Sequence, residues 1–94
     1  MKKITDEDIL KFARWSPHFV ALWEGNAEFI ATVFPSMSGD EFDRSCADLA
    51  LMRILALWTQ GDAEQMDRLF RQSALMRDKY ERLDYRESLF KAVL

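Results

Sequence analysis

The side chains with the clearest chemical potential are cations in the last third of the chain. They fall between residues 68 and 82, with a tyrosine among them. Cations attract phosphate groups, and an aromatic ring beside them can stack on an exposed base, which suits single-stranded DNA or a nucleotide. The alternative is a solvated surface on which these cations pair with nearby carboxylates. The candidate binding residues are Arg68, Arg71, Arg77, Lys79, Tyr80 and Arg82.

Charge is distributed unevenly along the sequence. The formal net charge of −3 counts against a free nucleic-acid-binding protein, which is usually basic. Residues 1–67 carry six Lys/Arg against twelve Asp/Glu, whereas residues 68–94 carry seven against four. The chain therefore combines an acidic front with a basic tail, and a phosphate contact is expected in the tail.

Residue types that support catalysis are scarce. The chain has one histidine, His18, and one cysteine, Cys46. A zinc site would need more ligands, and nothing in the sequence places the histidine beside a nucleophile. Glycine-rich phosphate-binding motifs are absent from the sequence, and the carboxylates at predicted helix starts are better explained by capping than by Mg²⁺ binding. We therefore expect no catalytic residue, no metal and no cofactor, and a protein that is not an enzyme by itself.

Three single residues stand out from their surroundings. Cys46 lies in an apolar run, so we expect a small core residue and not a reactive thiol. His18 follows Pro17 at a predicted helix start, where a surface or half-buried position is expected. Arg53 is the only charge within residues 49–58, and arginine is rarely buried without a partner. We expect it to pair with a carboxylate or backbone carbonyls; the alternative is that it faces a groove.

The sequence also predicts the cellular compartment of the protein. No apolar stretch approaches the roughly 18 residues of a membrane span, and the N-terminus turns acidic at once, unlike a signal peptide. A single cysteine excludes an internal disulfide and favours a reducing environment. We expect a cytoplasmic protein that does not associate with membranes.

Length and composition predict one small helical domain. The chain has 94 residues, of which 49% are hydrophobic, and this suits one compact core. Three glycines and two prolines are too few for a fold with many β-turns. We predict an all-α fold in which residues 1–94 form a compact bundle of about five to six short helices. Residues 49–58 are apolar on almost every side and predict a central, buried helix.

Capping residues and breakers give the helix boundaries. Ser38 and Ser45 each begin a capping box, so the long helix has two candidate starts, of which we favour Ser45. Asp62 and Asp84 are the predicted caps of two later helices. The predicted helices cover residues 5–15, 17–23, 27–34, 45–58, 63–73 and 84–94, with a short charged piece at 76–83.

Residues 45–85 carry a pattern that resembles a known family. The pattern includes Trp-Thr-x-Gly-Asp at 58–62, Leu-Phe-Arg-Gln-Ser-x-Leu-x-Arg-x-Lys-Tyr at 69–80 and Asp-Tyr-Arg-Glu at 84–87. It resembles the helical-bundle accessory domain that follows the catalytic domain in phage and plasmid primase-polymerases, which are archaeo-eukaryotic-type primase proteins. Residues 6–25 resemble that domain more loosely.

The resemblance implies a non-catalytic module in DNA replication. Such a module helps to hold the single-stranded template and the initiating nucleotides, while a separate catalytic domain makes the primer. Tyr80 becomes a candidate stacking ring, or else packs the basic turn against the bundle, and Ser45 and Asp48 mainly cap a helix. The phosphate or nucleotide contacts that the resemblance implies are Arg71, Ser73, Arg77 and Lys79.

Two further functions stay open. Residues 58–62 could be the turn of a helix-turn-helix regulator with residues 63–73 as recognition helix, although Glu64 and Asp67 are poorly suited to a DNA groove. A third possibility is a protein-interaction module that docks through apolar ends at Phe34 and Leu94. The apolar C-terminal end indicates either docking on a partner or a module cut from a longer chain. Because no catalytic domain accompanies the module, the chain could also be a prophage remnant that has another use.

Overall fold

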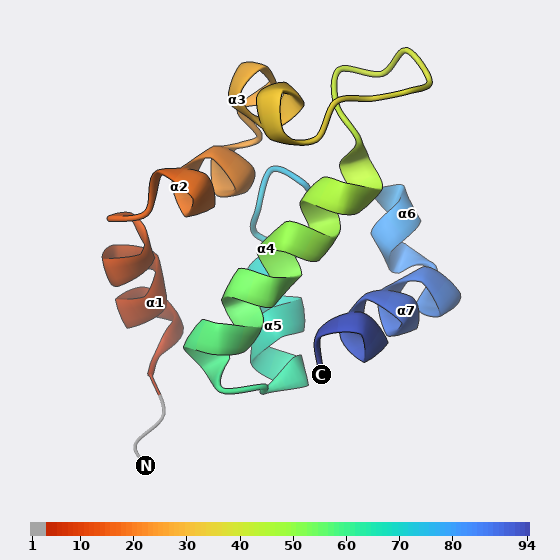
Figure 1. Cartoon of the computed structure of the whole chain (residues 1–94). Coiled ribbons are helices and arrows are strands. Elements are labelled where there is room, and N and C mark those ends of the chain that lie inside the picture. Colours follow the sequence, from red (N-terminus) through yellow and green to blue (C-terminus); the bar gives the residue numbers. More distant parts are fainter. Residues whose placement is uncertain (1–3) are drawn as a thin grey trace.

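The computed structural model describes residues 4–94, and within them the chain forms helices and no strand (Figure 1). The predicted all-α fold is confirmed, although these residues form seven helices where five to six were expected. The additional helix is a single short turn in the segment that was predicted as a charged piece. The helices are α1 Asp6–Ala13, α2 Pro17–Glu24, α3 Ala27–Val33, α4 Arg44–Thr59, α5 Ala63–Phe70, α6 Asp78–Glu81 and α7 Leu83–Val93.

Side-chain caps start five of these helices. Each cap oxygen accepts a hydrogen bond from a backbone N–H three residues later, which satisfies one of the free donors of the first turn. The five caps are Thr5, Ser16, Asn26, Asp43 and Asp62. The predicted cap at Asp62 is confirmed, whereas the predicted caps at Ser45 and Asp84 are wrong. Asp43 caps α4 instead, and Asp84 lies inside the first turn of α7.

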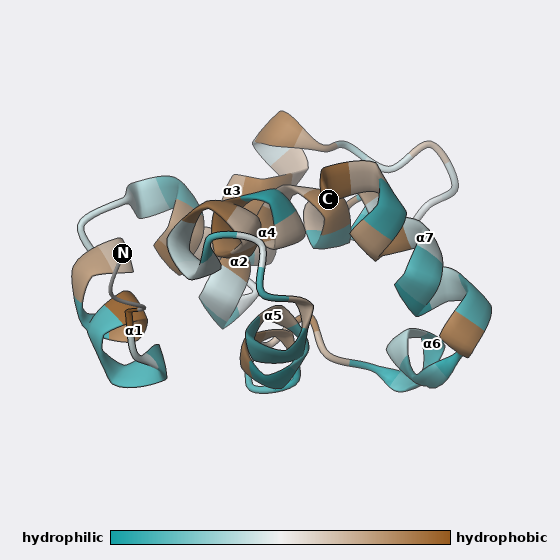
Figure 2. Ribbon diagram, turned by 90° about the horizontal axis from the view of Figure 1, so that it is seen from below, coloured by the Kyte–Doolittle hydropathy of each residue, from teal (hydrophilic) through white to brown (hydrophobic). Residues whose placement is uncertain are grey.

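The central helix is α4, which crosses the middle of the molecule with α5 behind it in Figure 1. It packs against α2, α5 and α7 through one buried side that includes Leu51, Met52 and Leu55. The opposite side is open, because Leu57 is 81% exposed. The prediction of a central, buried helix is therefore confirmed for the position of α4 and for one of its sides, whereas its other side is exposed. Figure 2 shows hydrophobic ribbon in α3, α4 and the end of α7 on the side away from α5.

The connection from α5 to α6 is fixed against the end of α2. Gly25 ends α2 with a left-handed φ of +68°, and a Cβ atom there would lie 2.9 Å from the Cβ of Ala74. The Ala74 N–H donates to the Trp23 carbonyl at 2.9 Å. Only glycine combines that backbone conformation with so close an approach. The contact holds the segment that leads to Arg77 and Lys79.

Two single-residue predictions are wrong. Cys46 is exposed on α4 and does not belong to the core, and slight desolvation together with the Asp43 carboxylate raises the pKa of its thiol. Arg53 is also exposed, and it forms no ion pair within residues 4–94. It borders two apolar hollows, as the groove alternative stated. His18 is on the surface, as expected, and its ring meets Phe29 edge-on.

Candidate functional site

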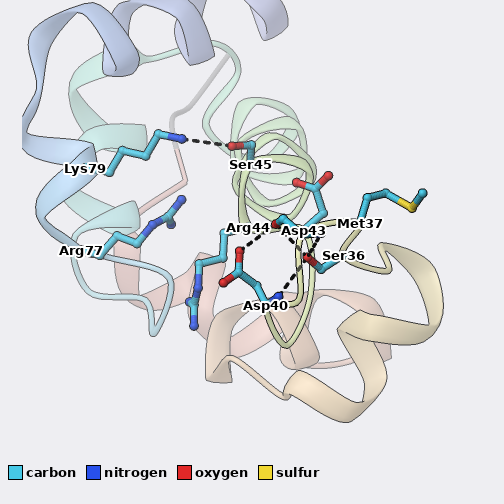
Figure 3. A pocket seen from close by; sticks show the side chains of 9 residues that line it. Ser36, Met37, Asp40, Asp43, Arg44, Ser45, Arg77 and Lys79 are labelled. Carbon is cyan, nitrogen blue, oxygen red and sulfur yellow. Dashed lines mark hydrogen bonds between the residues drawn. The ribbon is translucent and has the colours of Figure 1, made fainter.

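A polar hollow of about 400 Å³ lies where the connection before α4 meets the segment that carries α6 (Figure 3). In Figure 3 the side chains of Arg77 and Lys79 reach across from that segment toward Ser45 and Arg44 of α4. The cationic and hydroxyl groups that line the hollow are Arg44, Arg77, Lys79, Ser36, Ser38 and Ser45. Of the predicted binding residues, the structure brings together Arg77 and Lys79 here.

Arg77 is held by a buried carboxylate. Its two terminal nitrogens donate to the two oxygens of Asp48, each at 2.8 Å, and one of them also donates to the Leu75 carbonyl at 3.1 Å. The Asp48 side chain is completely buried, and the Arg77 side chain is 22% exposed. Burial works against the charged guanidinium, but the hydrogen bonds and charge of Asp48 outweigh it and raise the pKa of Arg77. The pair fixes the Arg77 side chain against α4.

Tyr85 and Lys79 extend this network. The Tyr85 hydroxyl donates to Asp48, and burial, with the Asp48 hydrogen bond and charge, raises the pKa of Tyr85 to about 12. The Lys79 ammonium lies 4.4 Å from the centre of the Tyr85 ring and donates to the Ser45 hydroxyl at 3.2 Å. Lys79 is exposed and forms no ion pair with a carboxylate in the described part of the chain. Its charge acts on the Asp43 carboxylate without forming a direct ion pair.

The opposite wall contains hydroxyls and two carboxylates. The Ser36 hydroxyl accepts hydrogen bonds from the backbone N–H groups of Ser38 and Asp40, at 3.1 and 3.2 Å. Asp43 caps α4, and its hydrogen bonds with Cys46 hold the pKa of the Asp43 carboxyl below its usual range. Asp40 accepts a hydrogen bond from the Ser38 hydroxyl at 3.2 Å. These carboxylates offset part of the positive charge of the hollow, and the Asp43 carboxylate also interacts with the charge of Lys79.

Three of the predicted cations lie away from the hollow, each paired with an acid. Arg68 binds Asp6 through two hydrogen bonds, of 2.6 and 2.8 Å. Arg71 pairs with Asp67 and Glu81, and Arg82 pairs with Asp84. The hypothesis that the basic tail forms one continuous surface is therefore wrong. The solvated, self-paired alternative describes these three arginines.

Tyr80 and Ser73 are unavailable to a ligand. Tyr80 is completely buried, with its ring stacked on Phe70 at 4.4 Å and its hydroxyl donating to Asp67 at 2.7 Å. The prediction of a stacking ring is therefore wrong, and the alternative, in which Tyr80 packs the basic turn against the bundle, is correct. Ser73 is also buried, and its hydroxyl donates to the Phe70 carbonyl at 2.7 Å.

Sequence reasoning missed the two residues that organise the site, Asp48 and Tyr85. Asp48 was assigned to a cap together with Ser45, which is wrong because Asp43 is the cap. Asp48 has apolar neighbours on both sides in the sequence, and a carboxylate in such a run must find a cation when the helix is buried. That signal pointed to an arginine partner. Arg44 was missed as well, and no sequence signal separates it from an ordinary surface cation.

Comparison with known proteins gives the family. Residues 44–93, more than half of the chain, match the family described as the NrS-1 polymerase HBD domain. The chain belongs to this family. The HBD match begins at the first residue of α4 and ends at the last residue of α7, so α1 to α3 lie outside it. The matched domain is a non-catalytic part of its polymerase, so the chain is not an enzyme by itself.

One relative places the HBD match in a longer protein. The chain is 45% identical over 49 residues to the DNA primase-polymerase of Nitratiruptor phage NrS-1. The match covers 52% of this chain but 7% of that protein. The predicted resemblance to the accessory domain of a phage primase-polymerase is thereby confirmed. No solved structure matches the chain significantly.

Among residues 4–94, no cluster of three or more His, Cys, Asp or Glu side chains could hold a metal ion. None of the helices in that range combines the length and apolar character that a membrane crossing needs.

Proposed function

We propose that the polar hollow binds phosphate groups of single-stranded template DNA or of a nucleotide, as an accessory site for a primase-polymerase. The supporting observation is that two exposed cations that form no ion pair within the described residues, Lys79 and Arg44, border the same hollow. Arg77 lines the same hollow and carries N–H groups beyond those that Asp48 occupies. Serine hydroxyls beside these cations can donate to phosphate oxygens.

The pairing pattern explains why this hollow is favoured over the rest of the basic tail. An arginine whose charge is already balanced by a carboxylate gains less from a phosphate than an unpaired cation does, even where some of its N–H groups are free. Arg68, Arg71 and Arg82 are in that position. Lys79 contacts a hydroxyl and an aromatic ring and forms no ion pair, and the Asp43 carboxylate acts on it only through its charge, so a phosphate can add a direct negative partner.

The family match also supports an accessory role for this site. The relative is named a DNA primase-polymerase, and the chain matches 7% of its length. We infer that the module acts beside a catalytic domain that builds the primer, and that it keeps the template or the initiating nucleotide close by. The helix-turn-helix alternative gains no support, because α5 has eight residues and its Asp67 and Arg68 are engaged in ion pairs.

A second candidate function, protein interaction, has an observation of its own. An apolar hollow of about 260 Å³ lies between α2, α3 and α4, and it is bordered by Phe34 and Arg53. A neighbouring hollow is lined by Leu57 and Leu94, which are 81% and 58% exposed. Exposed apolar groups gathered on one face are typical of docking surfaces. Docking there would be insensitive to salt.

Fluorescence anisotropy with labelled oligothymidylate tests the first function. The 94-residue chain is titrated at two salt concentrations, with Lys79→Ala as the variant and Lys91→Ala as the matched control, because Lys91 is an exposed lysine away from the hollow. We expect Lys79→Ala to weaken binding about tenfold and Lys91→Ala to leave it unchanged. Binding should weaken as salt rises, with a slope of about 0.7 per phosphate contact. Absence of binding at low salt, or equal binding by Lys79→Ala, contradicts the proposal.

A further inference from the structure

Two aromatic side chains are exposed at the end of α1, away from the polar hollow. Trp15 is 86% exposed and Phe12 is 48% exposed, although aromatic rings of this size are usually largely buried. They belong to the run Lys-Phe-Ala-Arg-Trp at residues 11–15, in which cations and rings alternate around one alanine. The alanine, Ala13, is 1% exposed and anchors the run to the core.

The two cations of this run are not paired with carboxylates. Lys11 and Arg14 are exposed, and neither forms an ion pair within residues 4–94. The Lys11 ammonium lies 5.7 Å from the centre of the Phe12 ring. This differs from the arginines of the basic tail, of which Arg68 and Arg82 are held by acids.

Two hollows share Arg14, which directly precedes Trp15 in the chain. One hollow, of about 320 Å³, lies between Arg14 and the stacked rings of Phe19 and Trp23. The other, of about 360 Å³, lies between Arg14 and Lys11. The carboxylates that border these hollows are Glu24 and Glu7, one in each. A strand that passes over Arg14 therefore meets a cation in both hollows and an exposed ring next to it.

We propose that Trp15 is a base-stacking contact for single-stranded DNA, and that Lys11 and Arg14 hold the adjoining phosphates. This inference rests on the proposed function, since it adds a second contact to the same strand. Figure 1 places α1 and α6 on opposite sides of α4, so the strand would cross the module from the polar hollow to Trp15. The molecule is 44 Å along its longest axis. The Trp15 contact lies outside the residues that match the HBD family.

Stacking requires an accessible ring, and this separates Trp15 from the tyrosine of the basic tail. Tyr80 is completely buried between Phe70 and the flanking arginines, whereas Trp15 offers most of its surface. Every base has a flat face, so an exposed indole flanked by cations binds single strands with little sequence preference. Replacing such a ring by alanine costs about 1–3 kcal/mol per stacked base, or about a 5- to 150-fold loss of affinity.

The stacking contact is tested by comparing four proteins in the same anisotropy titration with labelled oligothymidylate, and two further variants test the phosphate contacts. The four proteins are the 94-residue chain, Trp15→Ala, Trp15→Phe and Leu57→Ala. Leu57 is the matched control, because it is an apolar side chain of similar exposure on α4. We expect Trp15→Ala to lose at least fivefold in affinity, Trp15→Phe to keep most of it and Leu57→Ala to match the parent. The double variant Lys11→Ala/Arg14→Ala should lower the salt slope by about 1.4, the value for two phosphates.

The outcomes separate this inference from the proposed function. If Trp15→Ala binds as the parent does while Lys79→Ala binds weakly, the stacking contact is refuted and the polar hollow stands. If Trp15→Ala binds weakly and Lys79→Ala binds as the parent does, the stacking contact stands and the hollow fails. If the parent binds no oligothymidylate at low salt, both are refuted. Equal losses in Trp15→Ala and Leu57→Ala would also refute stacking.

Discussion

The buried carboxylate of Asp48 receives two hydrogen bonds of 2.8 Å from the guanidinium of Arg77, which lies 29 residues later in the chain. The Tyr85 hydroxyl donates to the same carboxylate. One side chain of α4 thus fastens both the segment before α6 and the first turn of α7. Lys79 lies between these two attachment points, so its position at the polar hollow depends on an interaction inside the domain.

Removing Asp48 should destabilise the domain strongly. Asp48→Ala leaves Arg77 and Tyr85 without their acceptor, and breaking one partner of a buried pair costs about 3–5 kcal/mol. We expect the lower end of this range, because Arg77 is 22% exposed and can turn toward water. Urea denaturation measures the loss. Asp84→Asn, which affects an exposed pair with Arg82, is the control and should change stability little. Equal effects of the two variants would contradict the account.

Tyr80→Phe separates packing from recognition. The variant keeps the ring against Phe70 but loses the hydroxyl that donates to Asp67. Loss of a hydrogen bond to a charged group costs about 1.5–3 kcal/mol. Thermal denaturation should show this loss, while the affinity for oligothymidylate at a temperature where both proteins are folded stays unchanged. A fall in affinity without a fall in stability would restore Tyr80 as a ligand contact.

Gly25→Ala should be more harmful than Gly39→Ala. Both glycines have positive φ, +68° and +90°, so alanine is strained at each. At Gly25 the new Cβ would also meet the Ala74 Cβ at 2.9 Å, whereas nothing lies within 4 Å at Gly39. We expect a loss of about 1–2 kcal/mol for Gly39→Ala and a larger loss for Gly25→Ala. Denaturation midpoints that are equal for the two variants would show that the contact with Ala74 is not tight.

Stability should fall in acid partly because of Asp6. Its hydrogen bonds with Arg68, followed by that with Gln65, lower the pKa of Asp6 from 3.8 despite partial burial. Because the folded-state pKa is the lower one, Asp6 stabilises the fold above about pH 4 and loses this effect as the pH falls through the folded-state value. Urea midpoints between pH 6 and pH 2 should therefore drop less in Asp6→Asn than in the parent. Parallel drops would mean that the Arg68 pair does not contribute.

Local signals in the sequence predicted the helices well, because caps and breakers act over a few residues. Thr5 and Asp62 start helices where the capping pattern indicated. The start of α4 at Arg44 was missed by one residue, since Asp43, Ser38 and Ser45 are all acceptable caps. Asp43 is the cap, and the Ser45 hydroxyl instead accepts a hydrogen bond from the Lys79 ammonium.

The site was predictable only in part, because side-chain partners far apart in the sequence decide which cations are free. Sequence spacing grouped Arg68, Arg71 and Arg82 with Lys79, but it could not show the carboxylates that neutralise the three arginines. Burial of Tyr80 likewise depends on how its segment folds back on Phe70. The exposed Trp15 could not be recognised either, since its spacing is equally typical of a core position.

The most direct test of the central claim is an NMR titration of the ¹⁵N-labelled chain with unlabelled oligothymidylate at low salt. We expect backbone amide signals of residues 36–45 and 77–79 to shift together, with saturation at one common affinity, because both groups border the polar hollow. The same signals should return toward their free positions as salt is added. Unshifted amides in both groups, while the oligonucleotide perturbs other residues or none, would contradict the claim.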